Sequence, residues 1–298
     1  MIAGIETGGT KVVCGAVAEE RPQHLLHTRR IPTTTPEETT QAINAFLREI
    51  DSVEPISALG VASFGPVNVE PARERYGWVT GTPKAGWAHT DLLGRIELAG
   101  RVPTAMLSDV ASAALGEQRW GAGAARERVA YATFGTGVGV GLVLDGRLLH
   151  GNGYPEMGHI LVRRHPLDRY AGSCPFHGDC LEGLASGPAV LDRWGADTSS
   201  LPREERGPAF EMLGWYIAQL AATTAYTTGV ERFVVGGGVL KAPTLLEAAR
   251  VQLPRVTGGP GASHASSLDA PDFLASPALG DYSGVLGAVA AALFEATE

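Results

Sequence analysis

The chain has 298 residues, which is long enough to bury sizeable cores without disulfide staples and predicts about two domains. Hydrophobic residues make up 44% of it and charged residues 19%, which excludes a disordered chain. The chain contains 24 Lys and Arg and 32 Asp and Glu, which gives a net charge of −8. This negative charge disfavours a nucleic-acid backbone as the main partner. These values favour a small-molecule enzyme or a protein-binding module.

Membrane insertion and secretion are not predicted. The most apolar tail, residues 285–294, is shorter than the roughly 20 apolar residues that a bilayer requires. The N-terminus reaches Glu6 without a basic region, unlike a signal peptide. An odd count of three cysteines argues against a disulfide framework. We therefore expect a cytoplasmic protein.

The N-terminal part of the sequence predicts a hairpin followed by alternating helices and strands. Residues 7–10 have turn chemistry between two β-like runs. A helix is expected where apolar residues at 43, 46, 47 and 50 repeat with helical spacing. Residues 65–87 lack periodicity and are expected to form a long functional loop. The expected strands are 2–6, 12–17, 58–62 and 102–107, and the expected helices are 36–50 and 110–118.

The C-terminal part predicts further strands and helices, which together make the chain an α/β protein. A strand followed by a glycine-rich turn occurs near the start and again near Gly135. This similarity suggests two related halves, with a break near residues 121–124. Strands are expected at 129–134, 138–144 and 233–235, helices at 210–228 and 283–295, and a surface loop at 258–267.

Three glycine-rich turns each follow a β-like run. Glycines let backbone N–H groups approach phosphate oxygens closely, and a hydroxyl and a lysine add a donor and a charge to the first turn. One such turn alone indicates a hairpin turn or a packed strand. Three of them fit a cleft that grips a nucleoside triphosphate. The turns are Gly8-Gly9-Thr10-Lys11, Gly135-Thr136-Gly137 and Gly236-Gly237-Gly238.

Asp109 ends an expected strand and precedes an expected helix. One interpretation is a helix cap, since Asp is common at that position. The other is a general base, because ligand sites of α/β proteins gather at the carboxyl ends of strands. Such a base would take a proton from a substrate hydroxyl during phosphoryl transfer.

A metal site is predicted from His159, Cys174, His177 and Cys180, which are spaced as His-x14-Cys-x2-His-x2-Cys. This donor set suits Zn²⁺, and four protein ligands imply a closed structural site. The alternative is scattered buried cysteines and a surface histidine, and His165 is a weaker competitor for the fourth position.

Two glutamates lie next to the predicted metal ligands. Glu156 precedes His159 by three residues, and Glu182 follows Cys180 by two. A metal loop that holds both carboxylates would orient them toward sugar hydroxyls, which carboxylates bind well. The alternative is that they are ordinary surface acids.

These motifs, in this order, resemble those of the ROK-family sugar kinases over nearly the whole chain, and bacterial fructokinases in particular. The family-wide motifs are Glu6-Thr-Gly-Gly-Thr-Lys11, Ser108-Asp109, Thr133-Phe-Gly-Thr-Gly-Val-Gly139, Glu156-Met-Gly-His159, Cys174-x2-His-x2-Cys180 and Val235-Gly-Gly-Gly-Val239. The fructokinase-like segments are Ser63-Phe-Gly-Pro-Val67, Thr82-Pro-Lys-Ala-Gly-Trp87, Cys180-Leu-Glu-Gly-Leu-Ala-Ser-Gly-Pro188 and Leu279-Gly-Asp-Tyr-Ser-Gly284.

The resemblance implies an α/β, actin/hexokinase-like (ribonuclease H-like) fold with two domains and an interdomain cleft. It implies a smaller N-terminal domain at 1–120, a larger domain with the zinc-binding loop at 121–282, and a C-terminal helix at 283–298 that packs back on the first domain. It also implies a homodimer that binds a sugar and a nucleotide and neither nucleic acid nor a membrane.

The activity implied by the resemblance is transfer of phosphate from ATP to D-fructose, giving fructose 6-phosphate, with Mg²⁺ and a structural Zn²⁺. Asp109 is implied to be the catalytic base. Residues 8–11 and 135–137 would face the phosphates, and residues 236–238 would lie by the adenosine. The implied sugar-binding residues are Gly65, Pro66, Ser108, Glu156, His159 and Glu182.

Three positions depart from the common family pattern. Glu6 stands where Asp is more frequent and would contact Mg²⁺, and Ser108 stands where Asn often precedes the base. His177 replaces one cysteine of the glucokinase cluster, and the spacing differs. The last two changes favour a fructokinase over a glucokinase.

Three alternatives remain. The first is a related kinase for glucose, mannose or N-acetylmannosamine. The second is a sugar-responsive repressor, whose winged helix-turn-helix would precede a phosphate motif that here begins at Glu6. The third is a non-catalytic sugar-binding protein, which Asp109 and the three glycine turns argue against.

Overall fold

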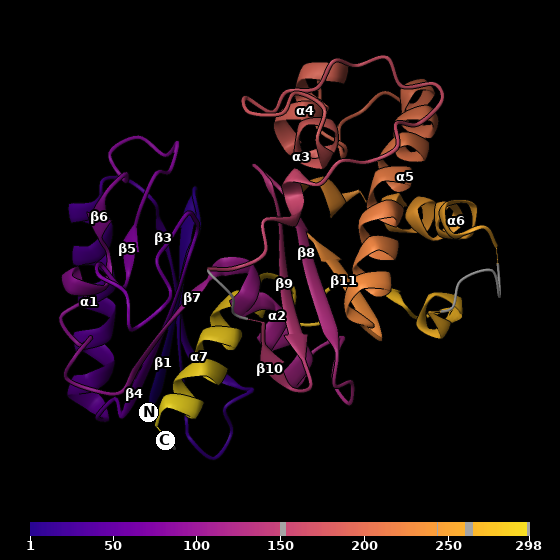
Figure 1. Cartoon of the computed structure of the whole chain (residues 1–298). Coiled ribbons are helices and arrows are strands. Elements are labelled where there is room, and N and C mark those ends of the chain that lie inside the picture. The colour runs from indigo at the N-terminus through magenta and orange to yellow at the C-terminus, as the bar shows by residue number, and fades with distance from the viewer. Residues whose placement is uncertain (150–152, 243, 260–264, 297–298) are drawn as a thin grey trace. The chain divides into compact units, whose positions relative to one another are not determined.

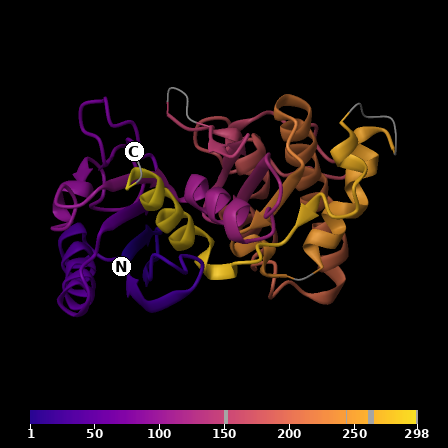
Figure 2. The ribbon, with the colours of Figure 1, turned by 90° about the horizontal axis from the view of Figure 1, so that it is seen from below.

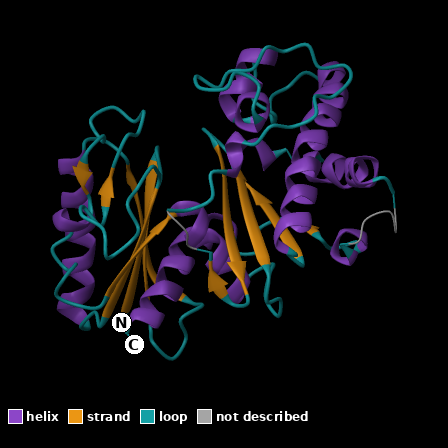
Figure 3. Cartoon of the chain, viewed as in Figure 1, coloured by secondary structure: helices purple, strands orange, loops and turns teal. Residues whose placement is uncertain are grey.

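The computed structural model describes residues 1–149, 153–242, 244–259 and 265–296 and divides into two compact units, each described by itself (Figures 1 and 3). Unit 1 comprises Met1–Gly121, residues 153–154 and the chain from residue 278 onward. Unit 2 comprises Ala122–Leu149 and Pro155–Pro277. The C-terminal segment therefore belongs to the unit that the N-terminus builds.

Unit 1 is built on a mixed sheet with the strand order β3-β2-β1-β4-β7. The strands β3, β2 and β1 pair antiparallel, whereas β1, β4 and β7 run parallel. The strands are β1 (Ile2–Thr7), β2 (Lys11–Val17), β3 (Leu25–Pro32), β4 (Ala58–Ser63) and β7 (Thr104–Ser108), with a separate pair β5 (Trp78–Val79) and β6 (Thr90–Asp91). The helices are α1 (Pro36–Val53), α2 (Asp109–Trp120) and α7 (Ser283–Glu295), with short 3-10 turns at Leu93–Arg95 and Gly280–Tyr282.

Helix α1 covers one face of this sheet (Figure 1). Its start is fixed by Thr35, whose hydroxyl accepts a hydrogen bond from the Glu38 N–H at 3.3 Å, and by Pro36 in the first turn. Its apolar stripe, which includes Ile43 and Phe46, is buried together with alternate residues of β1, β2 and β4. The alternating inward side chains of the strands therefore pack against the apolar face of the helix in one core.

Helix α7 packs against the sheet of unit 1 through a row of small residues. Gly15, Gly4 and Gly60 are directly opposite one another in β2, β1 and β4. A Cβ atom on Gly60 would lie 1.8 Å from the Ala288 carbonyl oxygen, and one on Gly4 would lie 2.5 Å from that of Val285. The glycines are needed because the helix backbone lies where side chains would otherwise stand.

The same helix packs closely against α2, beside which it lies (Figure 2). A Cβ atom on Gly287 would lie 1.6 Å from the Ser112 carbonyl oxygen, and one on Gly116 would lie 2.4 Å from that of Ser283. The Ser112 hydroxyl donates to the Gly284 carbonyl at 2.7 Å. Small residues therefore allow α7 to contact both the sheet and α2.

Unit 2 repeats the α/β plan with the strand order β10-β9-β8-β11-β12. The neighbours β8, β11 and β12 run parallel, while β9 is antiparallel to β8 and β10. Residues of β8, β9, β11 and β12 and parts of α3, α4, α5 and α6 share one buried core. The strands are β8 (Val129–Phe134), β9 (Val138–Leu144), β10 (Arg147–Leu148), β11 (Arg232–Gly236) and β12 (Leu274–Ala275). The helices are α3 (Leu181–Ala185), α4 (Gly187–Trp194), α5 (Arg203–Thr228) and α6 (Leu245–Thr257), with 3-10 turns η2 (Met157–His159), η3 (Gly238–Lys241) and η4 (Ser266–Asp269).

The strands and helices expected from sequence are confirmed, with corrections at their ends. The strand expected at 102–107 begins only at Thr104, and the helix expected at 210–228 begins at Arg203. The loop expected at 65–87 contains the short strand β5. Of the surface loop expected at 258–267, residues 260–264 lie outside the described residues.

Several elements were not predicted, and β3 gives the clearest reason. It is an edge strand whose side chains are mostly exposed, so its sequence lacks the alternation of a half-buried strand. Arginines on an edge strand also discourage pairing with another chain. Among the described helices, none is long and apolar enough to cross a bilayer.

We expect Gly287→Ala to destabilise unit 1 by about 1–3 kcal/mol, because the added methyl would overlap the Ser112 carbonyl. Helix propensity alone predicts the opposite sign, a gain of roughly 0.5–1 kcal/mol. Urea unfolding measures the difference. Gly81→Ala is the control, since a Cβ there meets nothing within 4 Å. Equal or higher stability of Gly287→Ala would contradict the packing of α7.

Candidate functional site

The turn between β1 and β2 is held rigidly by its own backbone and by the residue that follows β3. The Gly8 N–H donates to the Lys11 carbonyl at 2.9 Å. The Thr33 hydroxyl donates to the Gly8 carbonyl at 2.7 Å, and the Thr33 N–H donates to the Thr10 carbonyl at 3.0 Å. Gly9 and Thr10 remain exposed. The first glycine turn thus offers a preorganised backbone to a ligand.

Lys11 connects this turn to the C-terminal segment of the chain. Its ammonium lies 3.3 Å from the Asp281 carboxylate, which also pairs with Arg30 at 3.1 Å. These side chains are half exposed, so each pair contributes little to stability. The two cations share one carboxylate, so this group of side chains keeps a net positive charge that would attract a phosphate group to the turn that Lys11 ends.

Glu6 lies in β1 with its carboxyl group against the start of α7. A Cβ atom on Gly284 would lie 2.3 Å from the Glu6 carboxyl carbon, and the Val285 N–H hydrogen-bonds to this carboxyl group. Burial, followed by the negative charge of Asp109, raises the pKa of Glu6 from 4.5 to about 7, although Lys11 opposes the shift. Glu6 therefore titrates near neutral pH.

The parallel strands of unit 1 explain why distant polar residues meet. Thr7, Ser63 and Ser108 are register partners at the carboxyl ends of β1, β4 and β7. The Thr7 hydroxyl donates to the Ser63 hydroxyl at 2.9 Å. Residues just beyond this edge, such as Asp109 and Gly65, follow directly from these strands. Ligand sites of α/β sheets gather at such an edge.

Asp109 is the first residue of α2 and is partly buried. The cap of this helix is Ser108, whose buried hydroxyl accepts from the Ala111 N–H at 3.3 Å. One Asp109 carboxylate oxygen accepts from the Val110 N–H at 2.8 Å. Both side chains therefore accept N–H groups of the first turn, and Ser108 fills the capping position. The Asp109 carboxylate lies at a helix N-terminus, where negative charge is favoured.

Gly65 and Pro66, which the resemblance assigns to the sugar, follow β4 and are joined by a cis peptide bond. A Cβ atom on Gly65 would lie 2.4 Å from the Tyr154 hydroxyl oxygen, which accepts from the Val67 N–H at 3.0 Å. The Thr80 N–H donates to the Pro66 carbonyl at 2.7 Å. Sequence reasoning missed Tyr154, because it lies 87 residues from its partner and no local pattern marks it.

The other two glycine turns lie side by side in unit 2. They follow β8 and β11, which are parallel neighbours, so both turns leave the same edge of the sheet. Gly237 has a φ of +95°, and a Cβ atom there would lie 2.4 Å from the Phe134 carbonyl oxygen. Glycine is therefore required both for the backbone conformation and for the contact with the end of β8.

The turn at 135–138 is tied to α3 and α4. The Gly135 N–H donates to the Gly137 carbonyl at 2.9 Å, and the Gly187 N–H donates to the Gly135 carbonyl at 2.7 Å. The Val138 N–H donates to the Glu182 carboxylate at 3.0 Å. Glu182 thus contacts this turn as well as lying near the metal ligands in sequence.

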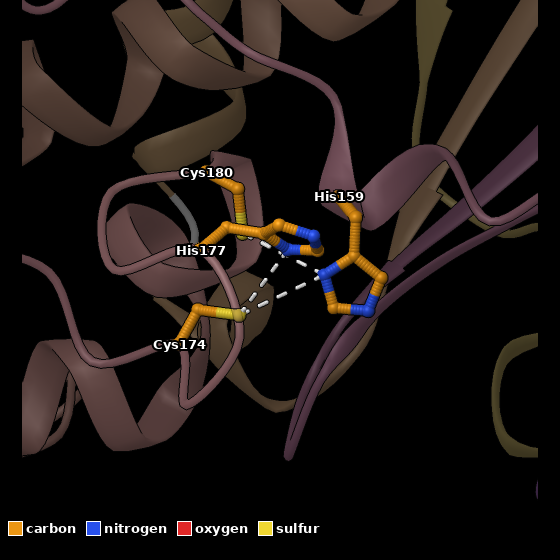
Figure 4. A group of neighbouring side chains, drawn as sticks. All are labelled: His159, Cys174, His177 and Cys180. Atoms are coloured by element: carbon orange, nitrogen blue, oxygen red, sulfur yellow. Dashed lines mark hydrogen bonds between the residues drawn. The ribbon is translucent and has the colours of Figure 1, made fainter.

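The four residues expected to bind a metal come together in unit 2 (Figure 4). His159 comes from η2, Cys180 immediately precedes α3, and Cys174 and His177 lie in the loop before it. Their ligand atoms lie within 4.8 Å of one another. The His159 Nδ1 atom is 3.8 Å from Cys174 Sγ and 3.6 Å from Cys180 Sγ, and His177 Nδ1 is 3.7 Å from Cys174 Sγ.

Three of these distances are close to those of a tetrahedral Zn²⁺ site. Zn–S bonds of about 2.3 Å and Zn–N bonds of about 2.0–2.1 Å give a separation of about 3.6 Å between a sulfur and a nitrogen ligand. The three S···N separations in the structure are 3.6–3.8 Å. Burial raises the pKa of the Cys180 thiol, so a cation is needed to hold it as the thiolate. His165 instead lies against Trp215, with ring centroids 5.7 Å apart.

The carboxyl group of Glu156 interacts electrostatically with His159 and with Glu182. Burial raises the pKa of the Glu156 carboxyl, against the opposing charge of His159 and with a further rise from Glu182. Two carboxyl groups therefore lie beside the His/Cys cluster.

The residues expected from sequence to bind phosphate, adenosine or sugar, or to act as the base, are found in both units. Unit 1 contains Gly8–Lys11, Gly65, Pro66, Ser108 and Asp109, and unit 2 contains Gly135–Gly137, Glu156, His159, Glu182 and Gly236–Gly238.

Comparison with known proteins identifies relatives along the whole chain. The model of the ROK family matches residues 2–295. The fructokinase of Zymomonas mobilis is 37% identical over 292 residues, which cover 97% of this chain and 95% of the relative.

Solved structures agree with the fold. The ROK hexokinase of Thermus thermophilus superposes with a TM-score of 0.79 at 25% identity, covering 99% of both chains. A ROK glucokinase of Streptomyces griseus, solved with glucose and AMPPNP, gives a TM-score of 0.73 at 25% identity, covering 98% of this chain and 99% of that one. With the mixed α/β sheets, these matches confirm the expected actin/hexokinase-like fold.

We expect the stability difference between Glu6→Gln and the wild type to change by up to about 3 kcal/mol between pH 4.5 and pH 7.5. The native pKa of about 7 lies above the ordinary value of 4.5, so the unfolded state loses its proton first as the pH rises. Wild-type stability is therefore lost over this range relative to the variant, as urea unfolding at each pH measures.

Glu38→Gln is the control for this titration. Thr34 and Thr35 lower the pKa of Glu38 from its ordinary value of 4.5, so at pH values above that its carboxyl group is mostly ionised in both the folded and the unfolded state. Its difference from the wild type should therefore stay constant between pH 5 and pH 7.5. A constant difference for Glu6→Gln as well would contradict the buried, raised carboxyl group.

Proposed function

The chain belongs to the ROK family, and from that membership we propose that it is an ATP-dependent sugar kinase that converts D-fructose to fructose 6-phosphate. The observation that carries the proposal is the position of Asp109 at the carboxyl edge of three parallel strands, beside Glu6 and the first glycine turn. The relative from Zymomonas mobilis, named a fructokinase, supports fructose as the sugar.

In the proposed reaction Asp109 removes the proton from the 6-hydroxyl of fructose. The freed oxygen attacks the γ-phosphorus of ATP, a new O–P bond forms, and the bond to the bridging oxygen breaks to release ADP. Backbone N–H groups of the glycine turns and the Lys11 ammonium stabilise charge on the transferring group, which is most of the catalysis in phosphoryl transfer. Mg²⁺ bound to ATP would offset further negative charge.

The proposal divides the roles between the two units. Unit 1 contributes the base Asp109, the phosphate turn at 8–11 and the sugar-binding residues Gly65, Pro66 and Ser108. Unit 2 contributes the phosphate turn at 135–137, the adenosine turn at 236–238 and the sugar-binding residues Glu156, His159 and Glu182. A cytoplasmic homodimer is the assembly that the resemblance implies.

Zn²⁺ is proposed as a structural cation held by His159, Cys174, His177 and Cys180. Four protein ligands leave no open position for a reacting water, so the ion would hold the loop and not enter the chemistry. In this role it would fix His159 and orient Glu156 next to it. The gathering of the four ligand atoms within 4.8 Å of one another, with three S···N distances of 3.6–3.8 Å, supports this assignment.

A second candidate is a kinase for another hexose, which the Streptomyces griseus glucokinase solved with glucose supports. ADP release with MgATP and fructose, glucose, mannose or N-acetylmannosamine as the sole sugar separates the two. We expect fructose to give the highest kcat/KM.

Asp109→Asn should lower kcat by about 10²–10⁴-fold and still bind fructose, because it removes the base and keeps the shape of the side chain.

Another sugar giving the highest rate would retain the kinase and remove the fructokinase assignment. Turnover by Asp109→Asn at the wild-type rate would contradict the role of the base. No turnover with any of the four sugars would contradict the proposed activity.

We expect purified protein to contain one Zn²⁺ per chain, measured by plasma mass spectrometry, and Cys174→Ser to lose it. Chelation should lower Tm by several degrees, because an ion that binds only the native state stabilises it. Cys14→Ala is the matched control: burial raises the pKa of Cys14 to about 12, so it stays a thiol in unit 1. Equal zinc in all three proteins would contradict the site.

A further inference from the structure

The carboxylate of Glu182 faces the second glycine turn in unit 2. One of its oxygens accepts the Val138 N–H at 3.0 Å, and a Cβ atom on Gly137 would lie 2.7 Å from that oxygen. The absence of a side chain at Gly137 therefore gives the carboxylate room to reach the backbone. A carboxylate that accepts a backbone N–H makes a stronger hydrogen bond than a neutral acceptor does.

The residue that follows the turn, Val138, is also contacted by backbone next to a metal ligand. A Cβ atom on Gly158 would lie 2.0 Å from the Val138 carbonyl oxygen, so the backbone before His159 lies directly against the turn. The Leu181 N–H, which follows Cys180, donates to the Ile160 carbonyl at 3.1 Å. The backbone next to the metal ligands therefore also contacts the backbone at the end of the turn.

We propose that Glu182 is a positioning residue for the nucleotide, which holds the turn at 135–138 in the conformation that binds phosphate. This inference rests on the proposed function, in which that turn faces the phosphates of ATP. The loop conformation is not maintained by the turn alone, because its single internal hydrogen bond joins Gly135 to Gly137. Glu182 adds a hydrogen bond at Val138, the first residue of β9, and the Gly187 N–H of α4 donates to the Gly135 carbonyl.

This role is additional to sugar binding, which the proposed function also assigns to Glu182, because only one of its carboxylate oxygens accepts from Val138. A sugar ligand would change the affinity for fructose and leave the affinity for nucleotide unchanged. A positioning residue of the turn would change the affinity for nucleotide even when no sugar is present. The two roles are therefore separated by measuring each ligand on its own.

The experiment measures MgADP binding by calorimetry without sugar, and fructose binding without nucleotide, on the full chain. We expect Glu182→Ala to weaken MgADP binding by about tenfold or more, because it leaves the Val138 N–H without its carboxylate. Glu182→Gln should lose less affinity than alanine, since its amide oxygen reaches the same N–H but is a weaker acceptor than the carboxylate. Glu182→Asp should behave like alanine, because its shorter side chain keeps the charge and loses the reach.

Glu127→Ala is the control, since Glu127 is exposed and precedes β8, at the opposite end of that strand from the turn. It should bind MgADP like the wild type. Equal MgADP affinity of the wild type, Glu182→Ala and Glu182→Asp would overturn the inference and leave the proposed function standing. A wild type that binds no MgADP would overturn both. If Glu182→Ala does not fold, as its Tm reveals, Glu182→Gln and Glu182→Asp still decide by their difference.

Discussion

The approach of α7 to the sheet of unit 1 is the constraint on which that unit depends. Its backbone lies against a row of glycines in β1, β2 and β4, where a Cβ atom on Gly60 would fall 1.8 Å from a helix carbonyl. Because the helix is seated there, its first turn meets Glu6, and the segment before it brings Asp281 to Lys11. The last helix of the chain thus completes the surroundings of the first turn.

In unit 2, a glycine-rich turn is likewise held by contacts from elements that follow it in the chain. Two glycine turns leave adjacent parallel strands, and the first of them is braced by Glu182 and Gly187 from the following helices. Glycine gives such a turn its close contact with a ligand but leaves the backbone with many conformations. Contacts from neighbouring elements are therefore what fix it. In unit 1 the Glu6 carboxyl group lies against Gly284 of α7, and in unit 2 the Glu182 carboxylate lies against Gly137.

Much of the fold could be predicted because local patterns carry it. The stripe that includes Ile43 and Phe46 predicted α1, and the runs before Gly135 and Gly236 predicted β8 and β11. The edge strand β3 could not be predicted, since its exposed side chains leave no alternation. Helix α3 was missed because five residues are too few to show a helical period. The His/Cys spacing predicted its cluster because three of its members lie within one loop.

The sequence by itself determined which chemical groups are present and in what order: the glycine turns, the Ser108-Asp109 pair and the soft ligands of the cluster. Only the tertiary structure decided what each group contacts. Lys11 and Asp281 are 270 residues apart, and Glu182 is 44 residues from Val138. Turns and helices follow from neighbours along the chain, whereas these contacts arise when sheets and helices pack. The raised pKa of Glu6 and the bracing of the second turn both result from that packing.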